Sequence, residues 1–249
     1  MRTVRLGNIM IGEGMPKVFV PIVGRSPGDV ITMGKRLAQA PLDGMEWRAD
    51  FCPAGKNEML SILAELRRAI GDLPLIFTFR TADEGGMAYM DRERYAALNR
   101  AVAVSGLGDG IDIETEWNGA KALIAQIQAT GCPVIGSRHI AGDTPCREKM
   151  ANILRGIQAA GPDICKLAVY AHSGADAMAL LSASDDFRRL YANRPFITMA
   201  MGEKGIITRI TGEIFGSAIT FASVGEGSAS GQIPLPQMNA LLRAVHEAI

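Results

Sequence analysis

The chain is 249 residues long, with 48% hydrophobic and 21% charged positions, and its 26 Lys and Arg residues balance 26 Asp and Glu residues. This ordinary globular composition provides enough apolar residues for one large core, and the length suits a single α/β barrel of about 250 residues. The net charge of +0 excludes a protein drawn as a whole to nucleic acid or to an anionic membrane, although a local cationic site for a small anion stays open.

Short apolar or β-branched runs alternate along the chain with longer segments of helical periodicity. The runs predict strands at Val18–Val23, Gly44–Arg48, Leu75–Phe79, Gly110–Glu114, Val134–Ser137, Ile164–Val169, Phe196–Met199 and Ala218–Phe221. The periodic segments predict helices at Asn57–Ile70, Arg92–Ser105, Cys146–Ala159, Ala175–Tyr191 and Leu235–Ala248. Asn57 is expected to cap the first of these helices and Gly71 to end it, Gly106 to end the second, and Thr144 and Pro145 to cap and open the third.

Regular alternation of strand and helix predicts parallel strands joined by helical crossovers. Eight such repeats in a chain of this length favour an α/β fold of the closed (β/α)8 TIM-barrel type over an open doubly wound sheet. The glycine fingerprint of a dinucleotide-binding fold is missing after the first strand, where the sequence reads Gly24-Arg25-Ser26-Pro27-Gly28. Residues Thr3–Ile11 are expected to form a short hairpin that closes the bottom of the barrel. Because no linker-like stretch divides the chain, we predict one domain over residues 1–249.

The four cysteines, Cys52, Cys132, Cys146 and Cys165, are scattered and lack zinc-type spacing, so we expect reduced thiols in a cytoplasmic protein. Residues 1–14 contain no sustained apolar region of the kind found in secretory signals. No stretch approaches the roughly 18 consecutive apolar residues that a membrane-spanning helix needs. The sequence therefore predicts a soluble protein with no nucleic-acid or membrane partner.

Polar residues interrupt the predicted strands near their carboxyl ends, where the active site of a (β/α)8 barrel lies. The second strand ends with Glu46 and Arg48, which share one face because side chains alternate along a strand. The third strand is followed by Arg80, and the fourth contains Asp112 and Glu114. These side chains are expected to meet at the mouth of the barrel.

Lys166 stands inside the apolar run Ile164–Val169, and a buried lysine needs either a partner or a function. Burial and nearby positive charge lower the pKa of lysine side chains in general and leave a neutral amine that can attack a carbonyl. The alternative is a lysine paired with a carboxylate at the barrel mouth, for example Glu114. The pattern alone supports both interpretations equally.

His139 follows the fifth strand and is expected to lie beside Lys166, where a histidine can transfer protons at neutral pH. A histidine with a purely structural role is the alternative. A metal site is not predicted, because the available ligands do not have metal-binding spacing: His139, Asp143, Glu46 and Glu84.

Two further features have an ordinary and a functional interpretation. Met199 and Met201 are core residues by default, but methionines can also form the apolar wall of a pocket for a carbocyclic ligand. The segment Gly225–Gln232 is rich in Gly and Ser, which is typical of a plain connection or of a loop that closes over a ligand. Ser228 and Gln232 favour the second interpretation, because they bring hydrogen-bonding groups to the barrel mouth.

Taken in order, these features resemble the type I 3-dehydroquinate dehydratases of the shikimate pathway, nearly from end to end. The matching blocks are Ile11–Lys17, Glu46–Asp50, Phe77–Gly86, Asp112–Glu114, Ser137-x-His139 with Thr144-Pro145, Lys166, Ile197–Met201, Arg209, Phe215–Ala218 and Ser228–Gln232. Each block alone is weak, whereas the ordered set is highly specific.

The resemblance implies a hydro-lyase that needs no metal or organic cofactor, removes water from the small molecule 3-dehydroquinate through a Schiff base, and forms a homodimer. It assigns Lys166 to the imine, His139 to proton transfer, and Glu84 to the carboxylate that orients His139. Arg209 corresponds to the arginine that binds the substrate carboxylate. The remaining implied contacts are Glu46, Arg48 and Arg80 around the substrate hydroxyls, Met199 and Met201 as the apolar wall, and Ser228 and Gln232 in the closing loop.

The chain departs from the family next to the histidine, where Arg138 replaces the more usual Asn or Tyr and Ile140 replaces Asp or Asn. Ser230 stands in place of a loop proline, and Pro21 where some members have serine. None of these changes removes a catalytic group. Two rival functions remain: a class I aldolase, which also uses a lysine on strand six, and a catalytically silent homologue that only binds a carboxylated ligand.

Overall fold

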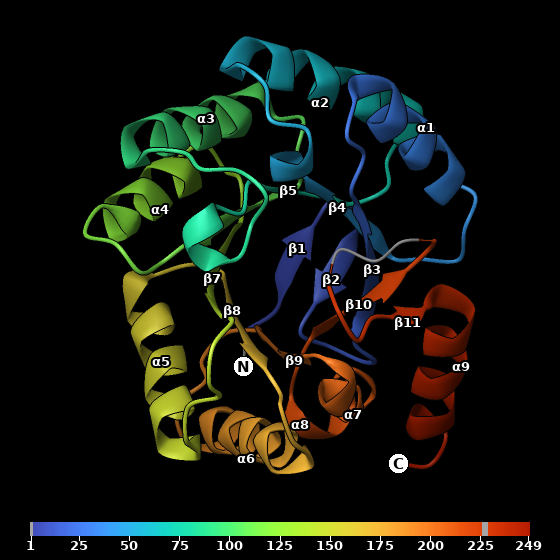
Figure 1. The fold of residues 1–249 in the computed structure, drawn as a ribbon, viewed down its shortest axis with the longest axis vertical. Coiled ribbons are helices and arrows are strands. Elements are labelled where there is room, and N and C mark those ends of the chain that lie inside the picture. Colours follow the sequence, from blue (N-terminus) through green and yellow to red (C-terminus); the bar gives the residue numbers. More distant parts are fainter. Residues whose placement is uncertain (1, 226–228) are drawn as a thin grey trace.

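Eight parallel strands form a barrel in the computed structural model, which describes residues 2–225 and 229–249 (Figure 1). The barrel strands are β3 (Lys17–Ile22), β4 (Gly44–Arg48), β5 (Leu75–Thr78), β6 (Gly110–Glu114), β7 (Val134–Ile140), β8 (Ile164–Tyr170), β9 (Phe196–Met201) and β10 (Ile219–Ser223). Parallel hydrogen bonding runs without a break from β10 through β3 to β9. The ring closes through a bridge between Phe196 and Ser217, where the Ala218 N–H donates to the Phe196 carbonyl at 2.8 Å. The predicted (β/α)8 barrel is therefore confirmed.

Helices surround the barrel on the outside (Figure 1). They are α1 (Pro27–Leu37), α2 (Lys56–Ile70), α3 (Arg92–Ser105), α4 (Ala120–Gln128), α5 (Arg147–Ala160), α6 (Gly174–Leu190), α7 (Ile207–Ile210), α8 (Gly212–Phe215) and α9 (Leu235–His246), with a short strand β11 (Ile233–Pro234) beside β10. Their apolar faces recur at helical spacing, as in the buried residues Met59, Ile62, Leu63 and Leu66 of α2. None of the helices in the described residues is long and apolar enough to cross a membrane.

The ends of several elements differ from those predicted. Helix α2 begins one residue before Asn57, and Gly55 is its N-cap without a side-chain hydrogen bond. Helix α5 begins after Cys146, because the Thr144 hydroxyl donates to the Tyr170 carbonyl instead of capping the helix. Thr144 and Pro145 therefore lie outside the helix that they were expected to open. The glycine ends are as predicted, at Gly71 and Gly106.

The N-terminal hairpin is also confirmed, as β1 (Val4–Leu6) paired antiparallel with β2 (Ile9–Ile11). Leu6 and Ile11 are fully buried and pack with the inward-facing apolar residues of the barrel strands. Leu6 lies against Gly110, the first residue of β6, which places the hairpin at the amino ends of the strands. The bottom of the barrel is thus closed by apolar contacts, and its mouth is left for polar groups.

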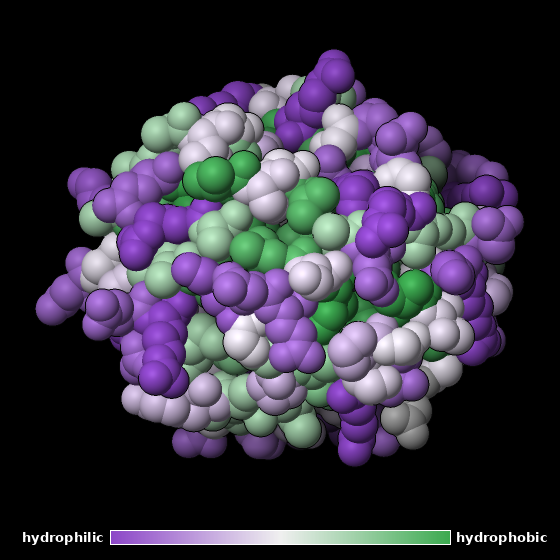
Figure 2. Space-filling model, turned by 90° about the horizontal axis from the view of Figure 1, so that it is seen from above, coloured by the Kyte–Doolittle hydropathy of each residue, from purple (hydrophilic) through white to green (hydrophobic). Residues whose placement is uncertain are grey.

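The outer surface is mixed. Figure 2 shows the face over α1 and α2, where hydrophilic side chains surround smaller apolar areas. The large apolar side chains that are exposed in the described residues are spread along the chain, among them Met87, Val104, Met178, Leu190 and Ile249. Scattered residues of this kind are normal for a protein surface and do not by themselves mark a partner.

Candidate active site

A cavity of about 200 Å³ opens at the carboxyl ends of the barrel strands. Its wall contains ten residues that the sequence singles out: Glu46, Arg48, Arg80, Glu84, His139, Lys166, Met199, Met201, Arg209 and Gln232. The eleventh, Ser228, lies outside the described residues. The strand pleat explains this convergence, because residues at alternate positions of β4, β8 and β9 all face the inside of the barrel.

Lys166 lies at the bottom of the cavity and is only 4% exposed. Its neighbours in β8, Cys165 and Leu167, pack into the outer core beneath the helices, so the pleat directs Lys166 inward. The Nζ atom lies 3.2 Å from Glu46 Oε1 and 3.0 Å from Asp112 Oδ2. The suggested partner Glu114 is not among its contacts, because that carboxylate binds other groups.

The aromatic ring of Phe221, from β10, lies beneath the same amine, with its centroid 4.8 Å from Nζ. Glu46 in turn accepts a hydrogen bond from the Thr78 hydroxyl at 2.9 Å. Two carboxylates and a π-face thus hold the amine at one point, with its remaining open side toward the cavity.

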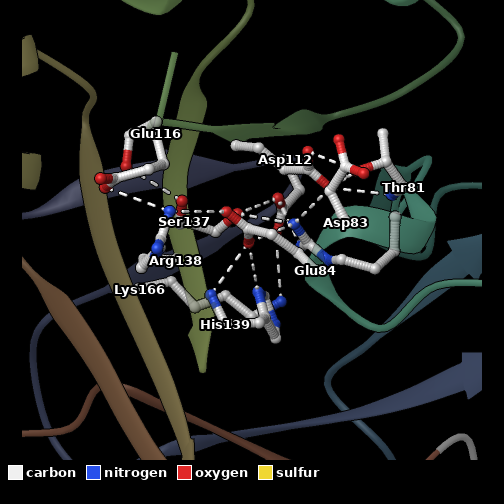
Figure 3. Close-up of polar contacts among 12 residues, drawn as sticks. Thr81, Asp83, Glu84, Asp112, Glu116, Ser137, Arg138, His139 and Lys166 are labelled. Carbon is white, nitrogen blue, oxygen red and sulfur yellow. Dashed lines mark hydrogen bonds and ion pairs between the residues drawn. The ribbon is translucent and has the colours of Figure 1, made fainter. Parts of the chain in front are cut away.

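His139 extends from β7 over the cavity and contacts Glu84 twice (Figure 3). Its backbone N–H donates to Glu84 Oε2 at 2.9 Å, and its Nδ1 lies 3.2 Å from the same oxygen. Burial, followed by the positive charges of Arg80 and Lys166, holds the pKa of His139 well below its usual value. The imidazole is therefore neutral at pH 7, and the Glu84 contact favours the tautomer with the proton on Nδ1 and a free Nε2.

Glu84 sits in the short turn that follows β5, and burial raises its pKa to about 7 despite the nearby positive charge of Arg80. Such a carboxyl gains or loses its proton in the physiological range. The contact between His139 and Glu84 therefore allows a proton to pass between a neutral imidazole and a carboxyl near neutral pH.

Arg80 joins these groups from the end of β5 and is itself 3% exposed. Its Nη2 donates to Asp112 Oδ1 at 2.8 Å, and its Nη1 lies 3.2 Å from Glu114 Oε1 and 3.3 Å from Glu84 Oε2. This guanidinium and Lys166 hold the pKa of Asp112 well below its usual range against the cost of burial. Asp112 is therefore a permanent anion that ties the lysine to the arginine.

Arg209 is the exception to this pairing. It is 1% exposed, yet among the described residues its guanidinium meets only weak acceptors, the Met199 sulfur at 3.8 Å and the Ser230 carbonyl at 3.4 Å. Its Nε is buried without a hydrogen-bond partner in residues 2–225 and 229–249, and burial lowers the pKa of Arg209 to about 10. A buried cation in this state is a strong site for a carboxylate from a ligand.

Thr78, Phe221 and Tyr170 were not predicted as site residues, although all three line the cavity. Asp112 was expected at the barrel mouth without an assigned role, and it contacts the lysine. A signal for Asp112 exists in the sequence, because it alternates with Glu114 in a strand whose other residues are apolar. No comparable signal marks Phe221 or Tyr170, which look like ordinary core residues. Within the described part of the chain, no group of three or more His, Cys, Asp or Glu side chains is arranged to hold a metal ion.

Comparison with known proteins identifies consistent relatives. The sequence model of the family described as type I 3-dehydroquinase matches residues 18–249. The 3-dehydroquinate dehydratases of Clostridioides difficile and Salmonella agona are each 40% identical to the chain, over all of it and over 99% and 100% of their own lengths. A crystal structure of the type I 3-dehydroquinate dehydratase of Clostridium difficile with covalently modified comenic acid superposes with a TM-score of 0.95 at 39% identity, covering 100% of this chain and 99% of that one. The Geobacillus kaustophilus 3-dehydroquinate dehydratase structure gives 0.95 at 32% identity, covering 99% and 97%.

Proposed function

The chain belongs to the type I 3-dehydroquinase family, and we propose that it removes water from 3-dehydroquinate to give 3-dehydroshikimate through an imine on Lys166. One observation carries the proposal. A single cavity contains a buried amine, a neutral histidine backed by a carboxyl, and a buried guanidinium that has no counter-ion among the described residues. These are the groups needed to bind a keto acid, activate its carbonyl and move the α-proton.

In the first step the Lys166 amine attacks the ketone carbon, a C–N bond forms, and the ketone oxygen leaves as water. Glu46, 3.2 Å from Nζ, is positioned to accept the proton that the ammonium loses before attack. The negative charge of Asp112 stays in place through this step and stabilises the protonated imine. A protonated imine draws electrons from the neighbouring C–H bond, so a weak base suffices for the next step.

His139 then takes the proton from the carbon next to the imine, and the C–H electrons move into the imine to give an enamine. The electrons of the enamine then return and expel the hydroxyl group from the next carbon. This hydroxyl accepts the proton from the His139 imidazolium and leaves as water. Glu84 supports the positive charge on the imidazolium between the two transfers. A second water hydrolyses the imine, which restores Lys166 and releases the enone.

The remaining wall residues position the substrate. Arg209 supplies a bidentate site for the substrate carboxylate, and Met199 and Met201 form the apolar wall. Glu46, Arg48 and Gln232 face the hydroxyls. The Arg80 guanidinium already donates to acidic side chains, so its proposed contact with a hydroxyl comes in addition to a role in holding Asp112 and Glu84.

Borohydride trapping tests the proposal. The protein is incubated with 3-dehydroquinate, reduced, digested and mapped by mass spectrometry, with Lys149→Ala as a control that removes an exposed lysine. We expect one stable adduct, on Lys166, in the wild type and the control, and none in Lys166→Ala. An adduct on a different lysine, or none from folded wild-type protein, would overturn the imine mechanism. An adduct without formation of the enone would instead indicate a protein that binds substrate and does not turn it over.

We also propose that the protein is a homodimer, lies in the cytoplasm and forms a single domain over residues 1–249. The resemblance to the family supports the first two, and the unbroken alternation of strands and helices supports the third. Light scattering coupled to gel filtration measures the mass in solution, which we expect to be twice the chain mass of 26.6 kDa.

A further inference from the structure

The two oxygens of Glu84 have different surroundings. The inner oxygen, Oε2, accepts from the His139 backbone and faces His139 Nδ1 and Arg80. The outer oxygen, Oε1, faces Arg138, whose Nη1 lies 3.7 Å away. The Glu84 side chain is 5% exposed, so water has little access to it and protein charges decide its ionisation.

Arg138 approaches Glu84 from the solvent side. Its side chain is 28% exposed and forms a second ion pair with Glu116 Oε2 at 3.1 Å, while the Glu116 side chain is 67% exposed. Figure 3 shows Arg138 between the two carboxylates. The guanidinium therefore links an exposed acid to the buried acid that contacts the histidine.

We propose that Arg138 is a positioning residue that favours the ionised form of Glu84 and directs it toward His139, and that it thereby sets the lower pH limit of catalysis. The inference rests on the proposed function, in which His139 is the base. It concerns a side chain that has no contact with the substrate cavity, since Arg138 is not part of its wall.

The charges around Glu84 explain why a second cation matters. Burial alone raises the pKa of Glu84, and the positive charge of Arg80 opposes this only in part because Asp112 and Glu114 share that guanidinium. Glu114 raises the pKa further, whereas the His139 backbone N–H and Arg138 lower it. Within the described residues, the charged groups that face the Glu84–His139 pair are Arg48 from β4, Arg80 from the end of β5, Asp112 and Glu114 from β6, Arg138 from β7 and Lys166 from β8.

The direction of the effect follows from the pKa of Glu84, which is raised to about 7. The carboxylate is present above this pH and is lost as the pH falls through it. Removal of Arg138 takes away a positive charge that favours the carboxylate, so Glu84 becomes protonated at a higher pH. Removal of Glu116 leaves Glu84 as the remaining ion-pair partner of Arg138 among the described residues, so Glu84 becomes protonated at a lower pH.

The first experiment compares the pH dependence of kcat/KM in Arg138→Gln with that of the wild type. An opposite charge at this distance changes a carboxyl pKa by about one unit or more, and we take one unit because Arg138 is partly exposed. In Arg138→Gln we expect the fall of kcat/KM at low pH, the acidic limb of the profile, to begin about one pH unit higher than in the wild type. This shift makes kcat/KM about tenfold lower than that of the wild type at pH 6 and less than about twofold lower at pH 9. Arg138→Lys keeps the charge and is expected to keep the limb near the wild-type position. Arg189→Gln is the matched control, because it also removes an arginine that pairs with two carboxylates, Asp185 and Asp186.

The second experiment follows Glu84 directly in protein without substrate, by ¹³C NMR of labelled glutamate, with the Glu84 signal identified by its loss in Glu84→Gln. We expect the Glu84 titration to move up in Arg138→Gln and down in Glu116→Gln. Equal titrations in all three proteins, or a loss of kcat/KM in Arg138→Gln that is the same at every pH, would overturn the proposal. If the wild type has no dehydratase activity the proposed function fails, and the NMR titration still decides the role of Arg138.

Discussion

The charged side chains of this site differ in whether they contact an oppositely charged group. Lys166, Arg80 and His139 all contact buried acids, whereas Arg209 meets only a sulfur and a carbonyl among the described residues. A guanidinium that loses its water without gaining an anion destabilises the free protein. If the described residues contain the whole surroundings of Arg209, a bound carboxylate would recover part of that cost, and we propose this gain as a source of substrate affinity.

Arg209→Lys tests this view, because the substitution keeps the charge and removes the planar fork. We expect KM for 3-dehydroquinate to rise by about 10- to 100-fold, the loss expected for a hydrogen bond to a charged group, with a much smaller change in kcat. Steady-state kinetics at pH 8 measures both constants. An unchanged KM would place the substrate carboxylate elsewhere in the cavity.

His139→Ala separates imine formation from proton transfer. The substitution leaves Lys166 and its contacts with Glu46 and Asp112 in place, so borohydride should still trap the adduct on the lysine. Loss of a general acid–base group lowers the rate by about 10²- to 10⁴-fold, and we expect kcat to fall within that range. Rapid-quench measurements should show the imine accumulating. A variant that neither traps nor turns over substrate would give His139 an earlier role, in the formation of the imine.

The sequence predicts these residues to different degrees. Lys166 and Asp112 both stand out as charged residues in apolar strands. Their contact could not be predicted, because 54 positions separate them and they meet only when β6 and β8 both turn these side chains into the barrel interior. Glu114 was the example of a carboxylate partner in one of the two interpretations of the lysine, and it contacts Thr81, Arg80 and Arg92 instead. Periodicity gives the face on which a side chain lies, and it does not give the distance across a barrel.

Elements show the same division. The sequence predicts all eight barrel strands, because buried parallel strands are short apolar runs. The strands β7, β8, β9 and β10 extend one to three residues past their predicted ends, and the β7 extension contains Arg138 and His139. Helix α1 was not predicted, although Ser26 caps it and Pro27 opens it, which is a recognisable start signal. Helix α4 has no side-chain cap and only nine residues, so its start carries no such signal.

The turn after β5 is the element that connects the fold to the chemistry. The Thr81 carbonyl accepts from the N–H groups of Glu84 and Gly86 at 3.0 and 2.9 Å, and the Thr81 N–H donates to Glu114 at 2.8 Å. A Cβ atom at Gly86 would lie 1.9 Å from the Arg80 carbonyl oxygen, so no other residue fits this position. The turn thus fixes Glu84 beneath His139.

Gly86→Ala should therefore damage both stability and activity. We expect the free energy of unfolding to fall by about 1–3 kcal/mol, as for other overpacked sites, and kcat/KM to fall because Glu84 moves away from His139. Urea denaturation and steady-state kinetics provide the two measurements. Gly174→Ala is the matched control, since a Cβ there meets nothing within 4 Å, and we expect a change in stability of less than about 1 kcal/mol. Full activity in Gly86→Ala would mean that the turn does not position Glu84.

Across the whole molecule, polar and apolar groups are separated along the barrel axis. The hairpin β1–β2 and the inward residues Phe19, Ile76 and Ile135 fill the lower barrel with apolar side chains, while Lys166, Glu46 and Asp112 lie above them. In barrels of this kind the lower face contributes stability and the upper face carries the chemistry. The interior below Lys166 also excludes water from beneath the amine, which strengthens its interactions with the two carboxylates.

Leu6→Ala tests whether the two ends act independently. Leu6 is fully buried in the hairpin, so truncation leaves a cavity at the bottom of the barrel and should lower the free energy of unfolding by about 2–5 kcal/mol. At 25 °C, where the variant is still folded, kcat, KM and the lower pH limit of activity should match those of the wild type. In the described part of the chain, the polar partners of Lys166 and Arg80 come from the barrel strands and the turn after β5, and not from the hairpin. Urea denaturation and kinetics measure the two effects, with Val104→Ala, an exposed site on α3, as a control expected to change stability by less than about 0.5 kcal/mol. A Leu6→Ala protein with altered KM or pH dependence would show that the hairpin helps to shape the active site, and the bottom of the barrel would then have to be counted as part of the catalytic structure.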